Sequence, residues 1–171
     1  FIVVVSPDDR DIISYFREES PLKCLIRFVY QPERKGMANA LACAAPFIKE
    51  DFVLSSCDNL VAPSHVGDLI HAWQVDGPME GLISLRRVDR SEVSKLGIVE
   101  LNGKRVVRIV EKPRPEEAPS DIASLPLYIF TPRILEYLPR VPLSERGEYE
   151  LQDAIQMLID DGYEVRGLFT E

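Results

Sequence analysis

Two stretches of this chain place charged side chains at the ends of short apolar runs. Residues 52–59 read FVLSSCDN, so that an apolar run stops at Asp58 between small and polar residues. Residues 109–113 read IVEKP and put Glu111 and Lys112 at the end of a second run. A carboxylate at the rim of a sheet suits Mg²⁺, which takes oxygen ligands and keeps positions for water and substrate phosphates. These residues therefore predict a site for a phosphorylated ligand, with Asp58 as the metal ligand.

The composition of the chain limits the function classes. With 171 residues, 46% hydrophobic and 28% charged, the chain predicts one globular domain with a sizeable core. Its formal net charge of -8 argues against nucleic-acid binding, which needs a basic face, but a small phosphorylated ligand needs only a few local cations. The three cysteines lack metal-type or disulfide-type spacing, so we expect a reduced, cytoplasmic protein. No signal peptide and no apolar stretch of membrane-spanning length is present, so we expect no membrane partner.

The first half of the chain alternates between apolar runs and helical patterns. Strands are predicted at Phe1–Val5, Leu25–Tyr30, Phe52–Leu54 and Gly81–Leu85. Helices are predicted after Ser6, over residues 37–48 and over Pro63–Val75. This alternation predicts a doubly wound, parallel sheet, with the first strand buried on both faces. Because the chain starts inside that strand, we expect residue 1 to be a truncation or processing point.

The second half changes character. Asn102-Gly103 predicts a tight turn between strands at Gly97–Leu101 and Val106–Val110. Residues 111–121 are rich in proline and acids, which predicts an exposed loop. Further elements are expected as a strand at Leu127–Phe130, a short helix around Leu135, a helix over Glu148–Asp161 and a last strand over Tyr163–Phe169.

Ligands bind at the carboxyl ends of strands in open α/β sheets, and four candidates follow such ends. They are Gln31, Asp58 with Asn59, the loop 86–96, and Glu111 with Lys112. Each also has a structural interpretation. Asp58 could be a turn or capping residue, and Glu111 with Lys112 could be a solvated ion pair.

Other polar and apolar residues carry weaker signals. Gln31 and Gly36 read as loop residues, although an amide can pair with a pyrimidine edge and a glycine allows close approach of a planar base. His65 and His71 are expected on the surface, whereas Trp73, Met157 and the cysteines are expected in the core. No glycine-rich loop follows the first strand, which disfavours a P-loop kinase or a dinucleotide-dependent oxidoreductase.

Five segments taken together carry a family resemblance. They are Gln31 with Gly36–Ala40, Cys57–Asn59, Leu96–Glu100, Ile109–Pro113 and Arg146–Asp153. Their order and spacing resemble the sugar-phosphate nucleotidyltransferase family, and within it the glucose-1-phosphate thymidylyl- and uridylyltransferases. The resemblance implies an α/β, Rossmann-like three-layer sandwich with a mostly parallel central sheet and an inserted β-hairpin. It covers nearly the whole of residues 1–171 as the central portion of such a domain.

The resemblance also implies roles for individual residues. Gln31 and Gly36 would recognise the base of dTTP or UTP, and Asp58 would hold Mg²⁺ near the α-phosphate. Gly97 and Glu111 would bind a sugar, and Lys112 would bind the phosphate of the sugar 1-phosphate. The implied reaction is attack of that phosphate on the α-phosphorus, which releases pyrophosphate and in which Asp58 and Lys112 are the catalytic residues.

The chain also departs from the family pattern. The glycine-rich N-terminal signature and a second magnesium-binding aspartate are expected outside this chain. At the sugar site, Leu125 and Pro126 stand where the family has a small Thr-Gly step. Two alternatives therefore stay open: a non-catalytic domain that binds a nucleotide sugar, and a glycosyltransferase, although no Asp-x-Asp pair accompanies Asp58. The resemblance leaves the sugar open and is compatible with a homo-oligomer.

Overall fold

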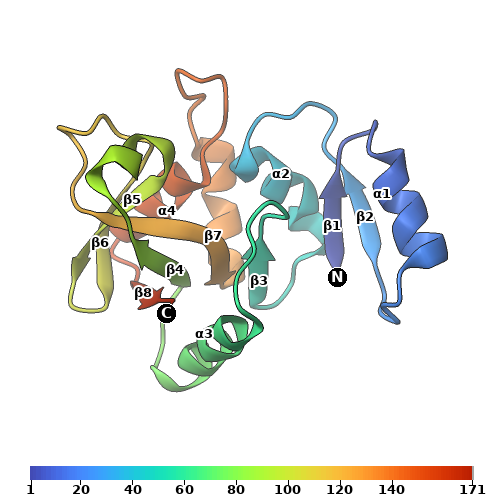
Figure 1. Cartoon of the computed structure of the whole chain (residues 1–171), viewed down its shortest axis with the longest axis horizontal. Helices are drawn as coiled ribbons and strands as arrows, with labels where there is room; N and C mark the ends of the chain where they lie inside the picture. The colour runs from blue at the N-terminus through green and yellow to red at the C-terminus, as the bar shows by residue number, and fades with distance from the viewer. Residues whose placement is uncertain (171) are drawn as a thin grey trace.

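The computed structural model describes residues 1–170, in which a six-stranded mixed sheet lies beside a separate two-stranded sheet (Figure 1). The helices are α1 (Arg10–Ser14), η1 (Tyr15–Glu19, a π-helix), α2 (Met37–Ala44), η2 (Ala45–Phe47), α3 (Pro63–Val75), η3 (Arg90–Lys95), η4 (Pro132–Glu136), η5 (Leu138–Arg140) and α4 (Leu151–Asp160). The strands are β1 (Ile2–Val5), β2 (Arg27–Tyr30), β3 (Phe52–Ser55), β4 (Gly81–Arg87), β5 (Gly97–Asn102), β6 (Arg105–Glu111), β7 (Ile122–Phe130) and β8 (Val165–Phe169).

The prediction of a mostly parallel sheet is wrong. The strand order is β3-β7-β4-β8-β6-β5, and within it only β4 and β8 pair in parallel. The predicted parallel pair β1–β2 is confirmed, but it forms a sheet of its own. The reason lies in β7, which enters antiparallel between β3 and β4 after the hairpin insertion. The alternation of strands and helices in the first half of the chain does not indicate that a later strand inserts between β3 and β4.

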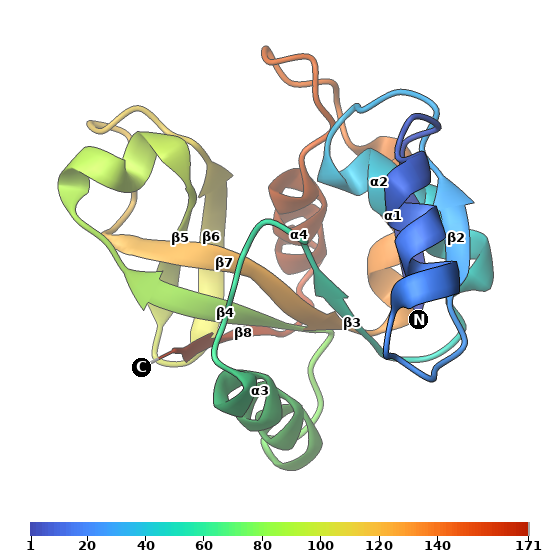
Figure 2. The same ribbon diagram turned by 45° about the vertical axis from the view of Figure 1, so that its right-hand side comes forward.

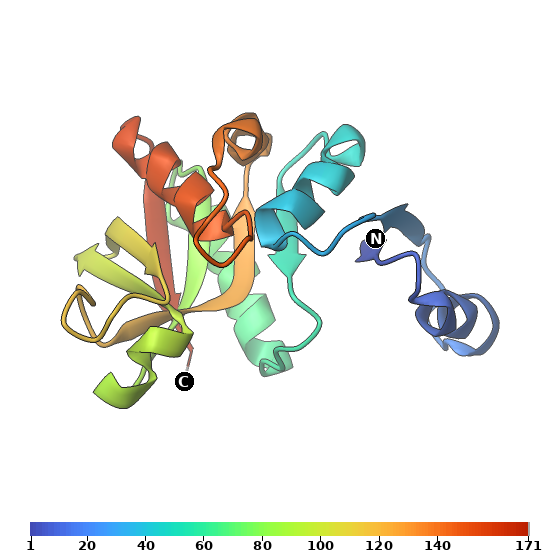
Figure 3. The same ribbon diagram turned by 90° about the horizontal axis from the view of Figure 1, so that it is seen from above.

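Helices cover both faces of the six-stranded sheet, which gives the three layers that the sequence predicts (Figure 3). The period-2 alternation of strand residues assigns them to the two faces. Ile83 of β4 and Tyr128 of β7 face the large core that includes α4, whereas Leu82 of β4 and Ile129 of β7 face Leu69 of α3. Because α3 packs on the sheet with one side only, a single apolar stripe along the helix is enough to complete this part of the core.

The prediction that the first strand is buried on both faces is wrong. Ile2, Val3 and Val4 are only half-buried, because β1 pairs with β2 alone and borders a groove. The groove, with a volume of about 1100 Å³, lies between β1 and β3 and is lined mainly by apolar side chains. Figure 1 shows β1, β2 and α1 set apart from the six-stranded sheet on the other side of β3.

The predicted hairpin is confirmed, with its turn shifted by one residue. Asn102 pairs with Arg105, so the two-residue loop is Gly103-Lys104 rather than Asn102-Gly103. Gly103 has a φ of 63°, a conformation that glycine adopts without the steric cost that a side chain imposes. The hairpin aligns Gly97 of β5 with Glu111 of β6, and this alignment later defines the candidate sugar site.

A proline inside β7 is accommodated by a bulge. Ile83 pairs with Tyr128 and Leu85 pairs with Ser124, so three residues of β7, centred on Pro126, oppose the single residue Ser84. Since proline has no N–H to give to a ladder, it is tolerated where the pairing is interrupted. The predicted strand Leu127–Phe130 is therefore only the second half of the longer strand β7.

Several single-residue expectations are corrected by the structure. His65 is buried, not on the surface, because its Nε2 lies 2.9 Å from the Oγ of Ser84 opposite the β7 bulge. His71 is exposed as predicted. Among the residues expected in the core, Trp73 and Met157 are only partly buried, and Cys24 and Cys57 are exposed. None of the helices in residues 1–170 has the length and hydropathy of a membrane span.

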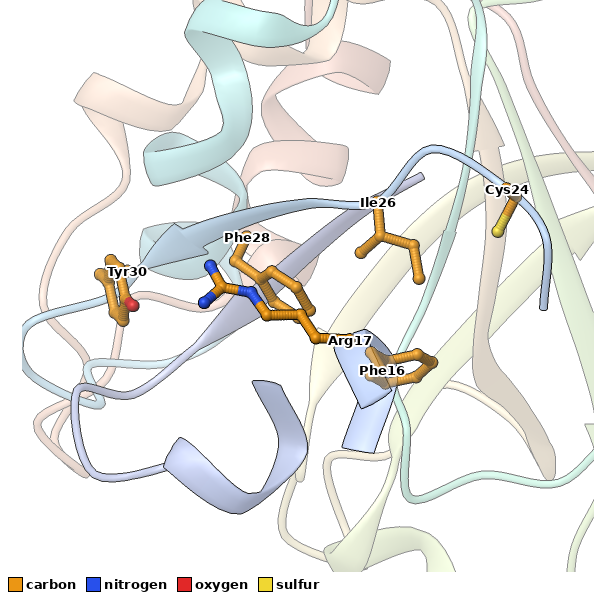
Figure 4. A pocket seen from close by; sticks show the side chains of 6 residues that line it. All are labelled: Phe16, Arg17, Cys24, Ile26, Phe28 and Tyr30. Atoms are coloured by element: carbon orange, nitrogen blue, oxygen red, sulfur yellow. The ribbon is translucent and has the colours of Figure 1, made fainter. Parts of the chain in front are cut away.

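A small hollow of about 340 Å³ lies between η1 and β2 (Figure 4). Phe16 of η1 and Phe28 of β2 have ring centroids 6.2 Å apart, and the guanidinium carbon of Arg17 lies 5.9 Å from the centroid of the Phe28 ring. These contacts attach η1 to the outer face of the two-stranded sheet. The hollow is therefore a packing feature of this unit.

Two glycines provide a matched test of the packing. A Cβ on Gly167 of β8 would overlap the side chain of Leu85, which is fully buried, whereas a Cβ on Gly67 of α3 meets nothing within 4 Å. We expect Gly167→Ala to lower the free energy of unfolding by about 1–3 kcal/mol through overpacking. Gly67→Ala should raise it by about 0.5–1 kcal/mol, since alanine is the better helix former. Urea denaturation measures both, and equal effects would contradict the described contact between β4 and β8.

Candidate active site

The strands that carry the candidate residues end on one side of the molecule. In Figure 2 the arrowheads of β2, β3 and β6, which precede Gln31, Asp58 and Lys112, point toward the upper end of the view. The loop that leads into α4 rises at the same end. Asp58 follows β3 and Lys112 follows β6, so both come from strands that end on this side, although no hydrogen bond or ion pair joins them.

Glu111 is the centre of the best-defined cluster of charged groups. Its side chain is only 14% exposed, and its Oε1 lies 3.8 Å from Nζ of Lys112 and 3.6 Å from Nη2 of Arg146. Its other oxygen, Oε2, is buried and has no hydrogen-bond partner. A buried acceptor without a donor is costly, so Oε2 is suited to accept a hydrogen bond from a ligand.

Burial and the neighbouring cations change the pKa of Glu111 in opposite directions. Burial raises the pKa of Glu111 above its ordinary value, and the nearby charges of Lys112 and Arg146 oppose that rise. Burial likewise raises the pKa of Asp153, with the negative charge of Glu150 acting in the same direction. Arg146 lowers the pKa of both Glu111 and Asp153 against the effect of burial, and its Nη2 also binds Glu150 Oε1 at 2.7 Å.

The backbone of Lys112 is strained. Successive residues of a strand point to opposite faces, yet the side chains of Glu111 and Lys112 approach each other. This is possible because Lys112 has a φ of 45°, in the left-handed region, while its N–H still bonds to Leu96 O at 2.9 Å. A non-glycine residue in this region costs about 1–2 kcal/mol, and such strain is concentrated at functional sites.

Gly97 is a glycine because polar groups crowd its α-carbon. A methyl group there would lie 2.7 Å from Ser124 Oγ, 3.0 Å from Glu111 Oε2 and 3.1 Å from Gln152 Nε2. These three groups come from β7, β6 and α4, so the site is assembled from segments far apart in the sequence. Tyr128 is buried beside Ser124, and this burial raises the pKa of its phenol.

Gln31 and Gly36 lie together, as the sequence predicts. The Nε2 of Gln31 donates to Gly36 O at 3.2 Å and to Asn39 Oδ1 at 2.8 Å. Because both amide hydrogens are then used, the carbonyl oxygen of Gln31 is the group left to meet a ligand.

Gly36 also has a structural role that the sequence does not reveal. Its φ is 90°, and a Cβ there would lie 2.6 Å from the carbonyl oxygen of Tyr149. The backbone of Tyr149 accepts from Ala38 N at 3.1 Å and donates to Lys35 O at 2.8 Å. The loop of Gln31 is therefore fastened to the segment that carries Arg146.

Asp58 is exposed, and its Oδ1 accepts a hydrogen bond from Ser56 Oγ at 2.6 Å. The neighbouring Asn59 has a buried amide nitrogen without a partner. Within residues 1–170, no three His, Cys, Asp or Glu side chains lie close enough together to hold a metal ion. One free carboxylate oxygen fits Mg²⁺, which is commonly bound through one or two carboxylates together with substrate phosphates and water.

Sequence reasoning gave no individual role to several residues of the site. Arg146, Glu150 and Gln152 belong to the segment that carries the family resemblance, but nothing local to that segment signals that it meets Glu111. Ser124 stands beside the unusual Leu125 and Pro126, which were the only local sign of its position.

Gly36 and Gly147 differ in how much a side chain would cost. Both have a positive φ, but Gly36, with φ 90° and ψ 175°, lies in a region that essentially only glycine adopts, and only there would a Cβ collide with another segment. We expect Gly36→Ala to destabilise the protein by about 1–3 kcal/mol more than Gly147→Ala, because the Tyr149 backbone must move. Urea denaturation gives the difference, and equal losses would show that the two segments are not in close contact.

Glu111→Gln should change the pH dependence of stability. Because the folded-state pKa of Glu111 is raised above the ordinary 4.5, the protein loses stability as the pH rises from that ordinary value through the folded pKa, and this loss then stays constant at higher pH. The variant keeps the shape without the buried charge, so we expect its stability relative to wild type to increase from pH 4 to pH 7. Thermal unfolding across this range measures the trend. A relative stability that falls with pH would show that the ion pairs outweigh burial.

The chain matches known proteins along its whole length. The family model described as nucleotidyl transferase matches residues 1–170. A UTP–glucose-1-phosphate uridylyltransferase, AglF of Haloferax volcanii, is 33% identical over 162 residues, which are 94% of this chain and 65% of that protein. A glucose-1-phosphate thymidylyltransferase of Streptomyces antibioticus is 34% identical over 148 residues, which are 85% of this chain and 40% of that protein.

Solved structures show the same fold. A UDP-glucose pyrophosphorylase crystallised with UDP-glucose superposes with a TM-score of 0.77 at 24% identity, over 98% of this chain and 72% of that one. The chain spans just under two thirds of the length of AglF and smaller shares of other curated relatives. The match over 170 residues, with the agreement in fold, shows that this chain belongs to the nucleotidyl transferase family.

Proposed function

We propose that the protein transfers a nucleoside monophosphate from dTTP or UTP to a sugar 1-phosphate, which gives a nucleotide sugar and pyrophosphate. The named relatives are glucose-1-phosphate uridylyl- and thymidylyltransferases, which supports a pyrimidine nucleotide and a hexose phosphate as substrates. The relatives extend beyond the region that this chain matches, so the activity in their names is a proposal for this chain.

The observation that supports this proposal most is the environment of Glu111. One buried oxygen lacks a donor, and the other lies close to the two cations Lys112 and Arg146. A sugar 1-phosphate offers hydroxyl donors and a dianionic phosphate within one small molecule. Its hydroxyl would bond to Glu111 Oε2 while its phosphate draws Lys112 and Arg146 toward it. Holding the phosphate in line is the main contribution a protein makes to phosphoryl-type transfer.

The nucleotide would lie on the side of Gln31 and Gly36. Thymine and uracil both carry an N3–H donor, which the free carbonyl oxygen of Gln31 can accept. Cytosine presents an acceptor at the same position, so this geometry favours dTTP or UTP over CTP. The backbone of Gly36 would lie against the base.

Asp58 would hold Mg²⁺ together with the phosphates of the nucleotide. When bound, Mg²⁺ offsets the charge that develops on the transferred phosphoryl group. The hydrogen bond from Ser56 fixes the orientation of the Asp58 carboxylate, which leaves its Oδ2 for the metal. The three free cysteines support a reducing, cytoplasmic location.

The direct test is magnesium-dependent release of pyrophosphate from dTTP or UTP in the presence of glucose 1-phosphate. We expect Asp58→Asn to lower kcat at least about 100-fold. Loss of a residue that only supports a metal ligand typically lowers activity about 10- to 100-fold, and loss of the ligand itself should lower it at least as much. Asp51→Asn is the matched control. Asp51 is exposed at the other end of β3, where it bonds to Trp73, and its substitution should leave kcat unchanged.

Full activity of the folded Asp58→Asn variant would exclude the metal role. Binding of glucose 1-phosphate or of UDP-glucose without any pyrophosphate release would instead identify a non-catalytic domain that binds nucleotide sugars.

A further inference from the structure

Gln152 is a buried amide without a hydrogen-bond partner in the described part of the chain. It lies in the first turn of α4 and is 7% exposed. Its Nε2 is directed at Gly97, beside the unpaired Oε2 of Glu111. A buried glutamine normally satisfies its amide, because an unpaired polar group costs about 1–3 kcal/mol.

The other polar groups around Gly97 are already occupied. The hydroxyl of Ser124 donates to the carbonyl oxygen of Gly97 at 3.4 Å. The Oε1 of Glu111 lies within 3.8 Å of Lys112 and Arg146. What remains unpaired is one carboxylate oxygen, which only accepts, and one amide, which both donates and accepts.

These two groups together match a pair of neighbouring hydroxyl groups. One hydroxyl can donate to Glu111 Oε2, and the next can donate to the carbonyl of Gln152 or accept from its amide nitrogen. A hexose presents several such pairs around its ring. The ribose of UTP presents one pair, but it is joined to the base, which is proposed to lie beside Gln31 and Gly36.

We propose that Gln152 is a specificity-determining residue that binds one ring hydroxyl of the sugar 1-phosphate. This inference rests on the proposed function and adds to it the residue that selects the sugar. A site built to bond a hydroxyl rejects an analogue that lacks it far more strongly than an apolar site does, because the buried amide is again left unpaired. The side chain acts on affinity for the sugar rather than on the transfer step.

The test compares the binding of glucose 1-phosphate with its 2-, 3-, 4- and 6-deoxy analogues by calorimetry. We expect the wild-type protein to bind one of these analogues at least about tenfold more weakly than glucose 1-phosphate. Gln152→Met keeps the volume and removes the amide, so it should weaken glucose 1-phosphate and leave that analogue unchanged, which brings their affinity ratio to about one. A purely structural role would weaken all the sugars alike.

Gln156→Met is the control on the same helix one turn later. Gln156 accepts from Ile109 N at 2.8 Å and donates to Asp160 at 2.8 Å, so it is paired. Its loss should lower the melting temperature and preserve the wild-type order of the sugars. Gln152→Met should not lower the melting temperature, since no bond within the protein is lost.

The outcomes separate this inference from the function on which it rests. If the wild type binds glucose 1-phosphate and Gln152→Met keeps its preference among the deoxy sugars, the role of Gln152 is overturned and the function stands. If no sugar 1-phosphate binds the wild type, both fail. NMR of the wild-type protein gives a second readout. The side-chain amide resonances of Gln152 should shift on addition of glucose 1-phosphate, while those of Gln156 should stay in place. A shift of the Gln156 resonances with no shift of those of Gln152 would also overturn the role of Gln152.

Discussion

The site is organised around one carboxylate that is buried before any ligand arrives. Glu111 ends β6 beneath the segment that precedes α4, and its burial raises its pKa while only one of its oxygens has neighbouring cations. An arrangement of this kind is unfavourable in the isolated protein and is retained where a ligand completes it. The strained backbone of Lys112 is part of the same arrangement, since it turns the ammonium toward Glu111 instead of toward the opposite face of the strand.

The two halves of the site are joined by backbone contacts. Tyr149 bonds to Lys35 and Ala38 on either side of Gly36, and Arg146 lies three residues before Tyr149. The loop on the base side and the segment on the sugar-phosphate side therefore share one boundary, although they lie more than a hundred residues apart in the sequence. This contact places a limit on Gly36 that is independent of any role in base recognition. Glycine is required there by the packing of the protein itself.

Local signals predict several elements with their bounds, but they miss the first half of β7 and the helix η3, and they do not predict how the elements assemble. The bounds of α3 follow from its apolar spacing and its leading proline, and the β5–β6 hairpin follows from its turn residues. The antiparallel entry of β7 could not be predicted, because it depends on pairing between strands distant in sequence. His65 was misplaced for the same reason, since its partner Ser84 belongs to another element. Glu111 and Lys112 could be identified as candidates from the motif itself. Their contact with Arg146, and the position of Gln152, depend on where α4 packs.

A crystal structure of the protein with glucose 1-phosphate would show whether Glu111 receives the sugar. We expect a sugar hydroxyl oxygen about 2.5–3.0 Å from Glu111 Oε2, with the phosphate group beside Lys112 and Arg146. A sugar bound elsewhere, or bound here with Glu111 Oε2 still lacking a donor, would contradict this expectation.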